Sequence, residues 1–126
     1  MKRITKNARG YEECCKYDDK GNIIYVKIRN GFEKWFEYDN KGNLIHTRDS
    51  EGNEYWNEYN DKGEEIFSKD SIGNEYWYEY NDKGKLIYVK NKNSNGDEIL
   101  EKFDDKGRLI YHKNSEGHEK FYEYED

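Results

Sequence analysis

The sequence predicts an all-β protein, an antiparallel meander of about 12 strands built from 21-residue hairpin repeats in one curled sheet or barrel-like spiral. Three observations predict it: the spacing of glycine, the turn residues before each glycine, and the aromatic and isoleucine residues that recur between them. The 126-residue chain has 11 glycines, separated alternately by 11 and 10 residues, with one interval of 12. This spacing leaves no room for a stable helix, because glycine costs about 1 kcal/mol inside one.

The first series of glycines closes turns of one composition. An aromatic residue, two Asp or Asn residues and a lysine precede the glycine, as in Tyr38-Asp-Asn-Lys-Gly42. Asp and Asn bond to nearby backbone and glycine accepts a positive φ, so we expect three-residue hairpin loops. The series comprises Gly21, Gly42, Gly63, Gly84 and Gly107, and the strands after these turns contain Ile24, Ile45, Ile66, Ile87 and Ile110.

The second series is expected to close two-residue hairpins. Asn30-Gly31 and Asn95-Gly96 are the strongest signals for such turns. The series comprises Gly10, Gly31, Gly52, Gly73, Gly96 and Gly117. Each of these glycines is followed two residues later by glutamate, and four residues later by Cys14, Trp35, Trp56, Trp77, Leu100 or Phe121. With an opening strand near Ile4, the two series give about 12 strands.

These turn types predict a register. A three-residue turn at Gly42 places Tyr38 opposite Leu44 and Trp35 opposite Thr47, and a two-residue turn at Gly52 places Thr47 opposite Trp56. The strand period of two then fixes the faces. One face is expected to carry Ile45, Thr47, Glu54, Trp56 and Glu58, and the other Leu44, His46, Tyr55 and Tyr59.

The 12-residue interval between Gly84 and Gly96 breaks the pattern. It contains Asn91-Lys92-Asn93-Ser94-Asn95 and is expected to lengthen one loop by two residues. Such a loop is either a neutral change at an exposed site or a contact loop on one rim.

Composition limits the function classes. The chain is 33% apolar and 40% charged, which is typical of disorder, but its 17% of aromatic residues and its lack of proline indicate a folded protein. The net charge of −6 argues against nucleic-acid binding and permits a basic protein partner. The sequence shows neither a signal peptide nor an apolar stretch long enough for a membrane span, so we expect a cytoplasmic protein with Cys14 and Cys15 as reduced thiols. A mature fragment of a larger precursor would show the same pattern.

The repeat resembles the YD repeat of Rhs-type proteins. The matching residues are Phe103-Asp-Asp-Lys-Gly-Arg-Leu-Ile, then Gly117, then Phe121-Tyr-Glu-Tyr124. The resemblance covers nearly the whole chain in about five units and implies one YD-like β-repeat domain over residues 1–126, a short stand-alone member. Large members form a spiral β-shell around a toxin domain. Short repeat proteins of this kind look like immunity proteins found beside toxin loci.

No catalytic constellation is recognisable, so we expect a protein that is not an enzyme and uses no cofactor or metal. The histidines His46, His112 and His118 occupy different repeat positions, unlike a ligand cluster. The turn Asp18-Asp-Lys-Gly21 lacks the remaining ligands of a calcium loop. Basic residues interleave with the acidic ones, so no large field of one sign is expected; they are Lys27, Arg48, Lys69, Lys90 and Lys113.

An aromatic stripe is the candidate binding site. Trp and Tyr dominate interface hot spots, although the same stripe could instead be the core. The predicted partner-binding residues are Trp35, Tyr55, Trp56, Tyr76, Trp77, Tyr78, Glu54 and Glu75. The first hypothesis is an immunity protein whose Glu and Tyr side chains occlude a basic toxin domain. The alternative is a structural or glycan-binding repeat protein, and terminal strands could also associate edge to edge.

Overall fold

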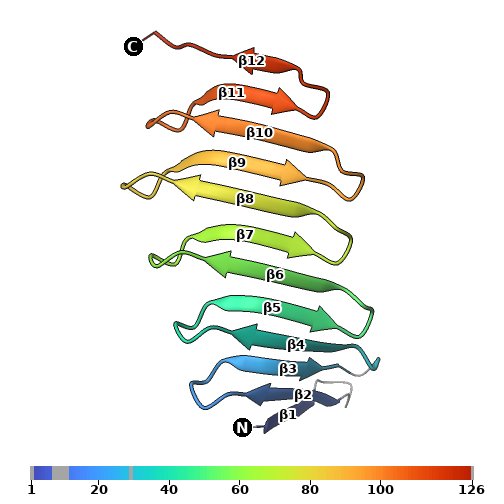
Figure 1. The fold of residues 1–126 in the computed structure, drawn as a ribbon. Coiled ribbons are helices and arrows are strands. Elements are labelled where there is room, and N and C mark those ends of the chain that lie inside the picture. Colours follow the sequence, from blue (N-terminus) through green and yellow to red (C-terminus); the bar gives the residue numbers. More distant parts are fainter. Residues whose placement is uncertain (1, 7–11, 29, 126) are drawn as a thin grey trace. The chain divides into compact units, whose positions relative to one another are not determined.

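The computed structural model describes the backbone of residues 2–6, 12–28 and 30–125, and the side chains of residues 14–28 and 30–125. These residues form twelve strands whose order in the sheet is the order along the chain (Figure 1). The strands are β1 (Lys2–Lys6), β2 (Glu12–Tyr17), β3 (Ile23–Lys27), β4 (Glu33–Tyr38), β5 (Leu44–Asp49), β6 (Glu54–Tyr59), β7 (Glu65–Asp70), β8 (Glu75–Tyr80), β9 (Leu86–Lys92), β10 (Glu98–Phe103), β11 (Leu109–Asn114) and β12 (Glu119–Phe121). The predicted all-β antiparallel meander is confirmed, with β1 at the predicted opening strand.

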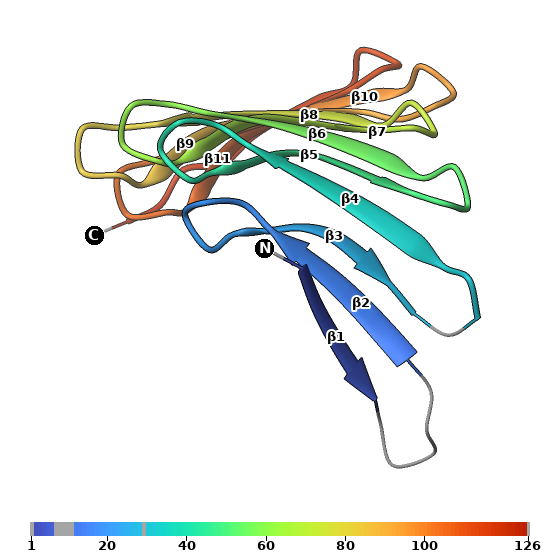
Figure 2. The ribbon, with the colours of Figure 1, turned by 90° about the horizontal axis from the view of Figure 1, so that it is seen from below.

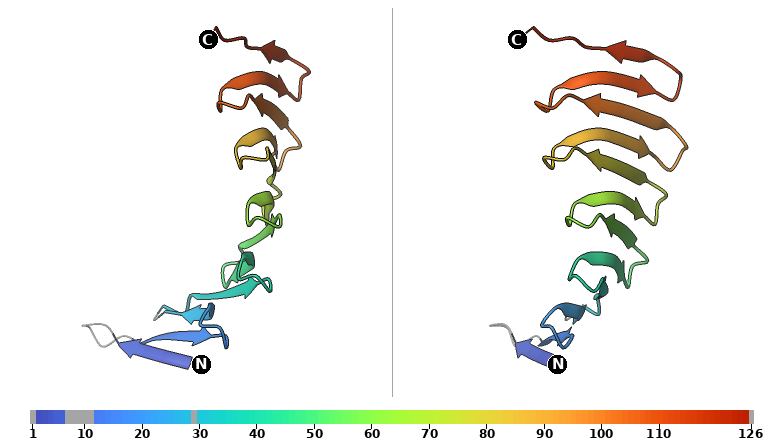
Figure 3. Two further views of the ribbon diagram at one scale, coloured as in Figure 1. Left: turned by 90° about the vertical axis from the view of Figure 1, so that its left-hand side faces the viewer. Right: turned by 60° about the vertical axis from the view of Figure 1, so that its left-hand side comes forward.

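The chain divides into two compact units, Met1–Trp56 and Asn57–Asp126, with the boundary inside β6. Within each unit, successive hairpin turns lie alternately at the two ends of the strands (Figure 3). In the first unit the strands from β1 to β5 rotate progressively, as expected of a twisted sheet (Figure 2). The described residues contain no helix that could cross a membrane. One domain over residues 1–126 stays a prediction.

The first-series turns have the predicted three-residue loop. At Gly42, the Asp39 amide donates to the Asn43 carbonyl over 2.9 Å and the Gly42 amide donates to the Asp39 carbonyl over 3.1 Å. Gly42 has a φ of 87°, which glycine adopts without strain. The Asp39 Oδ1 also accepts the amides of Lys41 and Asn43, so the side chain fixes the turn.

The second-series turns have the same three-residue loop, so the prediction of two-residue hairpins is wrong, including those at Asn30-Gly31 and Asn95-Gly96. At Gly52, the Asp49 amide donates to the Asn53 carbonyl and the Gly52 amide to the Asp49 carbonyl. At Gly52, Gly73, Gly96 and Gly117 the cause is the Asp or Asn three residues before the glycine, because its side chain accepts two loop amides. The equivalent residues are Asp70, Asn93 and Asn114. At Gly31 that position is Ile28, and the Asn30 side chain accepts the Phe32 amide instead. Gly10 lies outside the described residues.

A β-bulge in the first-series hairpins compensates for this extra loop residue. In β4–β5, Tyr38 lies opposite Leu44, as predicted, but Glu37 lies opposite His46, which leaves Ile45 as the extra residue. Two three-residue loops without a bulge would exchange the faces at every second hairpin. The same register shift is found between Lys16 and Tyr17, Glu79 and Tyr80, and Lys102 and Phe103.

The bulge changes which residues share a face. Trp35 lies opposite Arg48, not Thr47, and Thr47 lies opposite Tyr55, not Trp56. We define the tryptophan face by residues that alternate with it along the strands and pair across them. In the first unit it carries Lys16, Tyr25, Trp35, Glu37, His46, Arg48, Glu54 and Trp56. In the second unit it carries Phe67, Glu75, Trp77, Lys90, Leu100, Lys102, Tyr111, Lys113, Glu119 and Phe121.

The opposite side of each unit is the isoleucine face, because the isoleucine that comes after each first-series turn points to it. In the first unit it carries Val26, Phe36, Tyr38, Ile45, Thr47 and Tyr55. In the second unit it carries Ile66, Tyr76, Tyr78, Ile87, Val89, Asn91, Ile99, Glu101, Ile110 and His112. The predicted grouping of Ile45 and Thr47 is correct, but the residues of β6 are exchanged. Glu54, Trp56 and Glu58 lie on the face of His46, and Tyr55 and Tyr59 lie on the face of Thr47.

The two inserted residues lengthen a strand, not a loop, contrary to the prediction. The turn at Gly96 keeps the common geometry, with the Asn93 amide bonded to the Asp97 carbonyl. β9 is seven residues long, and its added end pairs Asn91 with Tyr76 on β8 and with Ile99 on β10. Because side chains alternate with a period of two, an insertion of two leaves the faces unchanged.

Neither unit has a buried hydrophobic core. No apolar side chain among the described residues is fully buried, and the one buried residue is Thr47, at 5% exposure. Most strand residues are half-buried. Each unit is therefore a single layer whose two faces are both accessible.

Candidate partner-binding faces

The structure divides the predicted partner-binding residues between two faces. Side chains alternate along a strand, so Tyr55 and Trp56 point to opposite sides, as do Tyr76 and Trp77. The tryptophan face carries Trp35, Trp56, Trp77, Glu54 and Glu75, and the isoleucine face carries Tyr55, Tyr76 and Tyr78. The predicted stripe is thus two surfaces with different chemistry.

In the first unit, basic groups cover the rings of the tryptophan face. The Arg48 guanidinium lies 4.6 Å from the Trp35 ring centroid, and Tyr25 packs on the same indole with 5.7 Å between ring centroids. His46 stacks on Trp56 at 5.4 Å with an interplanar angle of 17°. The rings are therefore already in contact with neighbouring side chains, and a sugar would have to displace them to stack there.

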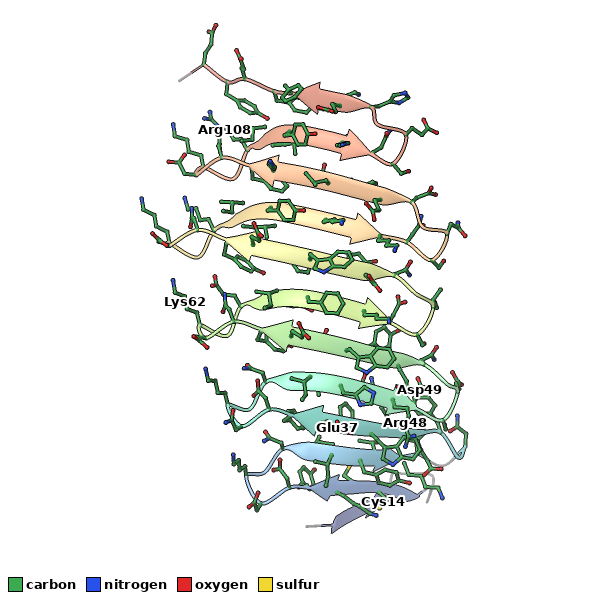
Figure 4. All side chains as sticks on the ribbon, viewed as in Figure 1. Cys14, Glu37, Arg48, Asp49, Lys62 and Arg108 are labelled. Atoms are coloured by element: carbon green, nitrogen blue, oxygen red, sulfur yellow. The ribbon has the colours of Figure 1, made fainter. Side chains whose placement is uncertain are left out.

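Two carboxylates flank the imidazole of His46. Its Nε2 lies 3.1 Å from Glu54 Oε2, and its Nδ1 lies 3.6 Å from Glu37 Oε1. Figure 4 labels Glu37 and Arg48 on this unit. The predicted residue Glu54 thus binds a neighbouring side chain. Partly exposed pairs of this kind contribute little to stability, since water screens them.

The second unit repeats this arrangement. Phe67 packs on Trp77 with 5.4 Å between centroids, and the Lys90 Nζ lies 5.1 Å from the Trp77 centroid. Glu75 Oε1 lies 3.9 Å from the Lys69 Nζ. Farther along the face, Lys102 covers the ring of Tyr111, which packs on Phe121. Acidic and basic groups alternate over the rings, so this face carries no large field of one sign.

The isoleucine face carries two exposed apolar strand residues. Tyr55 is 49% exposed and Ile99 is 41% exposed, whereas Tyr76 and Tyr78 are half-buried. Burial raises the pKa of Tyr78, and the nearby Glu65 carboxylate adds to the shift. Tyr122, the residue after β12, is 38% exposed. The third exposed large apolar residue on the described strands, Phe121, lies on the tryptophan face and is 73% exposed.

A recurring tyrosine has a structural role that the sequence did not reveal. The hydroxyl of Tyr38 donates to the Ile23 carbonyl over 2.8 Å, and that of Tyr80 donates to the Glu65 carbonyl over 2.7 Å. Tyr124 makes the equivalent bond to Leu109. Each acceptor is the first residue of a strand and lies outside the residue pairs described between that strand and the next one along the chain. The spacing of the sequence shows that this tyrosine recurs. The backbone carbonyl that accepts its hydrogen bond is seen only in the structure.

The other candidate residues are dispersed. His112 lies beside Glu101 and His118 beside Glu116, and no group of three or more metal-ligating side chains occurs among the described residues. Cys14 and Cys15 are free thiols that pair with Lys27 and Val26 and so point to opposite faces.

The surface of the described residues includes two hollows. One, of about 550 Å³, lies in the first unit and is lined by Asp18, Asp19, Lys20, Asn22, Ile24, Phe36, Glu37, Tyr38, Asp39 and Asn40. The other, of about 460 Å³, lies on the tryptophan face of the second unit beside Leu100. In the second unit Lys62 and Arg108 mark two of the first-series turns, and in the first unit Asp49 marks a second-series turn (Figure 4).

Comparison with known proteins supports the fold. No family model and no curated protein matches the sequence. Solved structures do match: TcdB2-TccC3-Cdc42 with a TM-score of 0.63 and TcdB2-TccC3-TEV with 0.64, both at 18% identity. The matches cover 82% and 83% of this chain but 5% of the matched chains, so this chain spans about one-twentieth of their length. The likeness supports a YD-repeat-like β fold.

Proposed function

We propose that this chain is a protein-binding β-repeat module and that its partner docks on the isoleucine face. One observation carries the proposal: the sheet is a single layer whose apolar face is uncovered in each unit, with Tyr55 and Ile99 nearly half exposed. Exposed apolar surface of this kind marks interaction sites, and tyrosine supplies contact area at low entropic cost.

The more specific proposal is an immunity protein that binds a basic toxin domain in the cytoplasm and occludes its active-site cleft. Its basis is the YD-like repeat together with the net charge of −6. An acidic protein attracts a basic partner over long range, which raises the association rate. Binding requires no catalytic group and no cofactor from this chain.

The direct test is co-purification. The chain is co-expressed with the product of the adjacent reading frame, and the complex is isolated by size-exclusion chromatography and assayed for toxin activity. We expect a stable complex in which that activity is suppressed. A neighbouring product that is not a toxin, or a toxin that stays active with the chain in excess, would remove the immunity proposal.

Two variants locate the docking face. Tyr55→Arg and Ile99→Arg place a charge in the apolar contact and should each weaken binding at least about tenfold. The matched controls lie on the tryptophan face of the same strands: Glu58→Gln in β6, which changes the charge by the same one unit as Tyr55→Arg, and Lys102→Gln in β10. Circular dichroism verifies that all four variants fold. Equal loss in the controls would mean that the isoleucine face is not the docking face.

A further inference from the structure

The hollow on the tryptophan face of the second unit occupies a place where other repeats have an indole. Three successive repeats have a tryptophan four residues after the second-series glycine, and the next repeat has Leu100 instead; the tryptophans are Trp35, Trp56 and Trp77. The first and last repeats have Cys14 and Phe121 at this position. The hollow beside Leu100 has a volume of about 460 Å³, within the roughly 300–1,000 Å³ of small-ligand sites. It is lined by Lys90, Glu98, Leu100, Lys113, Asn114, Ser115, Glu116 and Gly117.

Leu100 lies between two lysines. Its cross-strand partners are Lys90 on β9 and Lys113 on β11. Leucine is shorter than tryptophan and has no flat ring for a cation to cover. The substitution therefore leaves space between two basic side chains, where the preceding repeat is filled by Trp77.

Lys113 occupies the position of a ring-covering cation without a ring beneath it. In β4–β5, Arg48 pairs with Trp35 and covers it, and in β8–β9, Lys90 pairs with Trp77 and covers it. Lys113 pairs with Leu100 in the same way. In the part of the chain that the structure describes, its ammonium group has no aromatic contact and no ion pair, and the residue is exposed.

The charge around the hollow favours an uncharged occupant. Lys90 and Lys113 are balanced by Glu98 and Glu116, and the Lys90 Nζ already lies 3.8 Å from Glu98 Oε2. A neutral ring satisfies these groups better than an anion, because a cation attracts the face of a ring and a carboxylate accepts from an indole N–H.

We propose that this hollow binds an aromatic side chain, most favourably the tryptophan of a partner protein, with its ring against Leu100 and its face toward the Lys113 ammonium. The incoming ring restores the pattern of the repeat from outside the chain. The site lies on the opposite face from the docking surface proposed above. It rests on that proposal only for the identity of the partner, since a small probe tests the site directly.

The test is a titration with N-acetyl-tryptophanamide, a neutral indole, monitored by methyl NMR of the whole chain. We expect saturable shifts of the Leu100 methyl groups, and much smaller shifts with N-acetyl-leucinamide. No saturable shift, equal shifts with the two amides, or shifts centred on other methyl groups would each overturn the proposal.

Variants distinguish binding at this site from non-specific binding of the probe. Leu100→Trp fills the hollow with the chain's own ring and should abolish probe binding. Lys113→Gln, an exposed change with little effect on folding, should weaken it about two- to fivefold, the change that one exposed cation–π contact corresponds to. Lys102→Gln, which removes the cation over Tyr111 on the same face, is the control and should change nothing. Equal loss in Lys102→Gln would overturn the site.

The two proposals fail separately. Probe binding that survives in Tyr55→Arg and is lost in Leu100→Trp keeps this site even if no toxin partner exists. A toxin complex that forms with the chain, in the absence of any probe binding, would remove this site and leave the proposed function intact.

Discussion

The two kinds of hairpin share one turn but differ in the strand pairing next to it. Both close with a three-residue loop in which glycine takes a positive φ. In the described first-series hairpins a bulge lies directly after the loop, whereas the second-series hairpins have a regular ladder, as in β5–β6 and β7–β8. The difference shows that register in this protein is set by turn and bulge together.

The bulge also explains the recurring tyrosine. In β3 and β11 the extra residue of the bulge is the second residue of the strand, and the residue pairs with the next strand begin only after it. The carbonyls of Ile23, Glu65 and Leu109 lie outside the residue pairs with the next strand, and tyrosine hydroxyls bond to them. A first-series hairpin therefore influences the next strand pair along the chain, which is how a local irregularity becomes a repeating unit.

The largest expected effect is the loss of a single bulge residue. Deletion of Ile45 shifts β5 by one residue against β4, so the side chains of one strand exchange faces. We expect no cooperative unfolding transition by circular dichroism in urea. The matched control deletes two residues, Asn91 and Lys92, and should change the unfolding free energy by only about 1 kcal/mol, because two residues preserve the faces.

This control also removes the Asn91 Oδ1, a buried acceptor without a hydrogen-bond partner. Its loss offsets part of the lost pairing. Cooperative unfolding of the Ile45 deletion at wild-type urea concentration would show that the bulge does not set the register.

The next effect compares the backbone strain of the two series of turns. Gly42→Ala and Gly52→Ala should each cost roughly 1–2 kcal/mol, because both glycines have positive φ and an added Cβ would meet no atom within 4 Å at either position. The cost is pure backbone strain and should be equal in the two series. Urea denaturation measures it, with Gly42→Asn and Gly52→Asn as milder controls. Unequal costs would mean that the two turns differ in solution.

The sequence predicted the strands well because glycine and Asp or Asn act locally. The second-series turn was also readable from Asp49-Ser-Glu-Gly52, yet the stronger signal of Asn30-Gly31 suggested a two-residue loop. The bulge at Ile45 leaves no local mark, since apolar residues suit either position. A prediction that omits this bulge places Tyr55 and Trp56 on the wrong faces. It therefore groups the candidate site residues incorrectly.

A smaller effect isolates the tyrosine bond. Tyr80→Phe removes the hydroxyl that donates to Glu65 and should cost about 1 kcal/mol, the typical net contribution of one hydrogen bond. Tyr76→Phe, on the same strand and face, is the control, because no hydrogen bond from its hydroxyl occurs in the described chain. The natural Phe103 marks the position where Phe103→Tyr could add such a bond. An equal loss in Tyr76→Phe would assign the effect to the general loss of a hydroxyl.

The smallest expected effect is a loss of folding stability at acidic pH. Hydrogen bonds from the Asn43 backbone hold the pKa of Asp39 below its ordinary value, and hydrogen bonds from Asn53, opposed by partial desolvation, do the same for Asp49. A lowered folded-state pKa means that the contribution is complete above about pH 4 and is lost as the pH falls through the folded-state value. Stability should therefore decrease below pH 4, in turns of both series.

Asparagine makes the same turn without titrating, as Asn60 and Asn81 do. Asp39→Asn and Asp49→Asn, made separately, should each reduce the difference in urea midpoint between pH 7 and pH 3. Asp82→Asn should leave that difference unchanged, because Asp82 occupies an exposed loop position whose backbone bonds are fixed by Asn81. If only the first-series variant responded, the equivalence of the two turns would be limited to geometry and would not extend to their energetics.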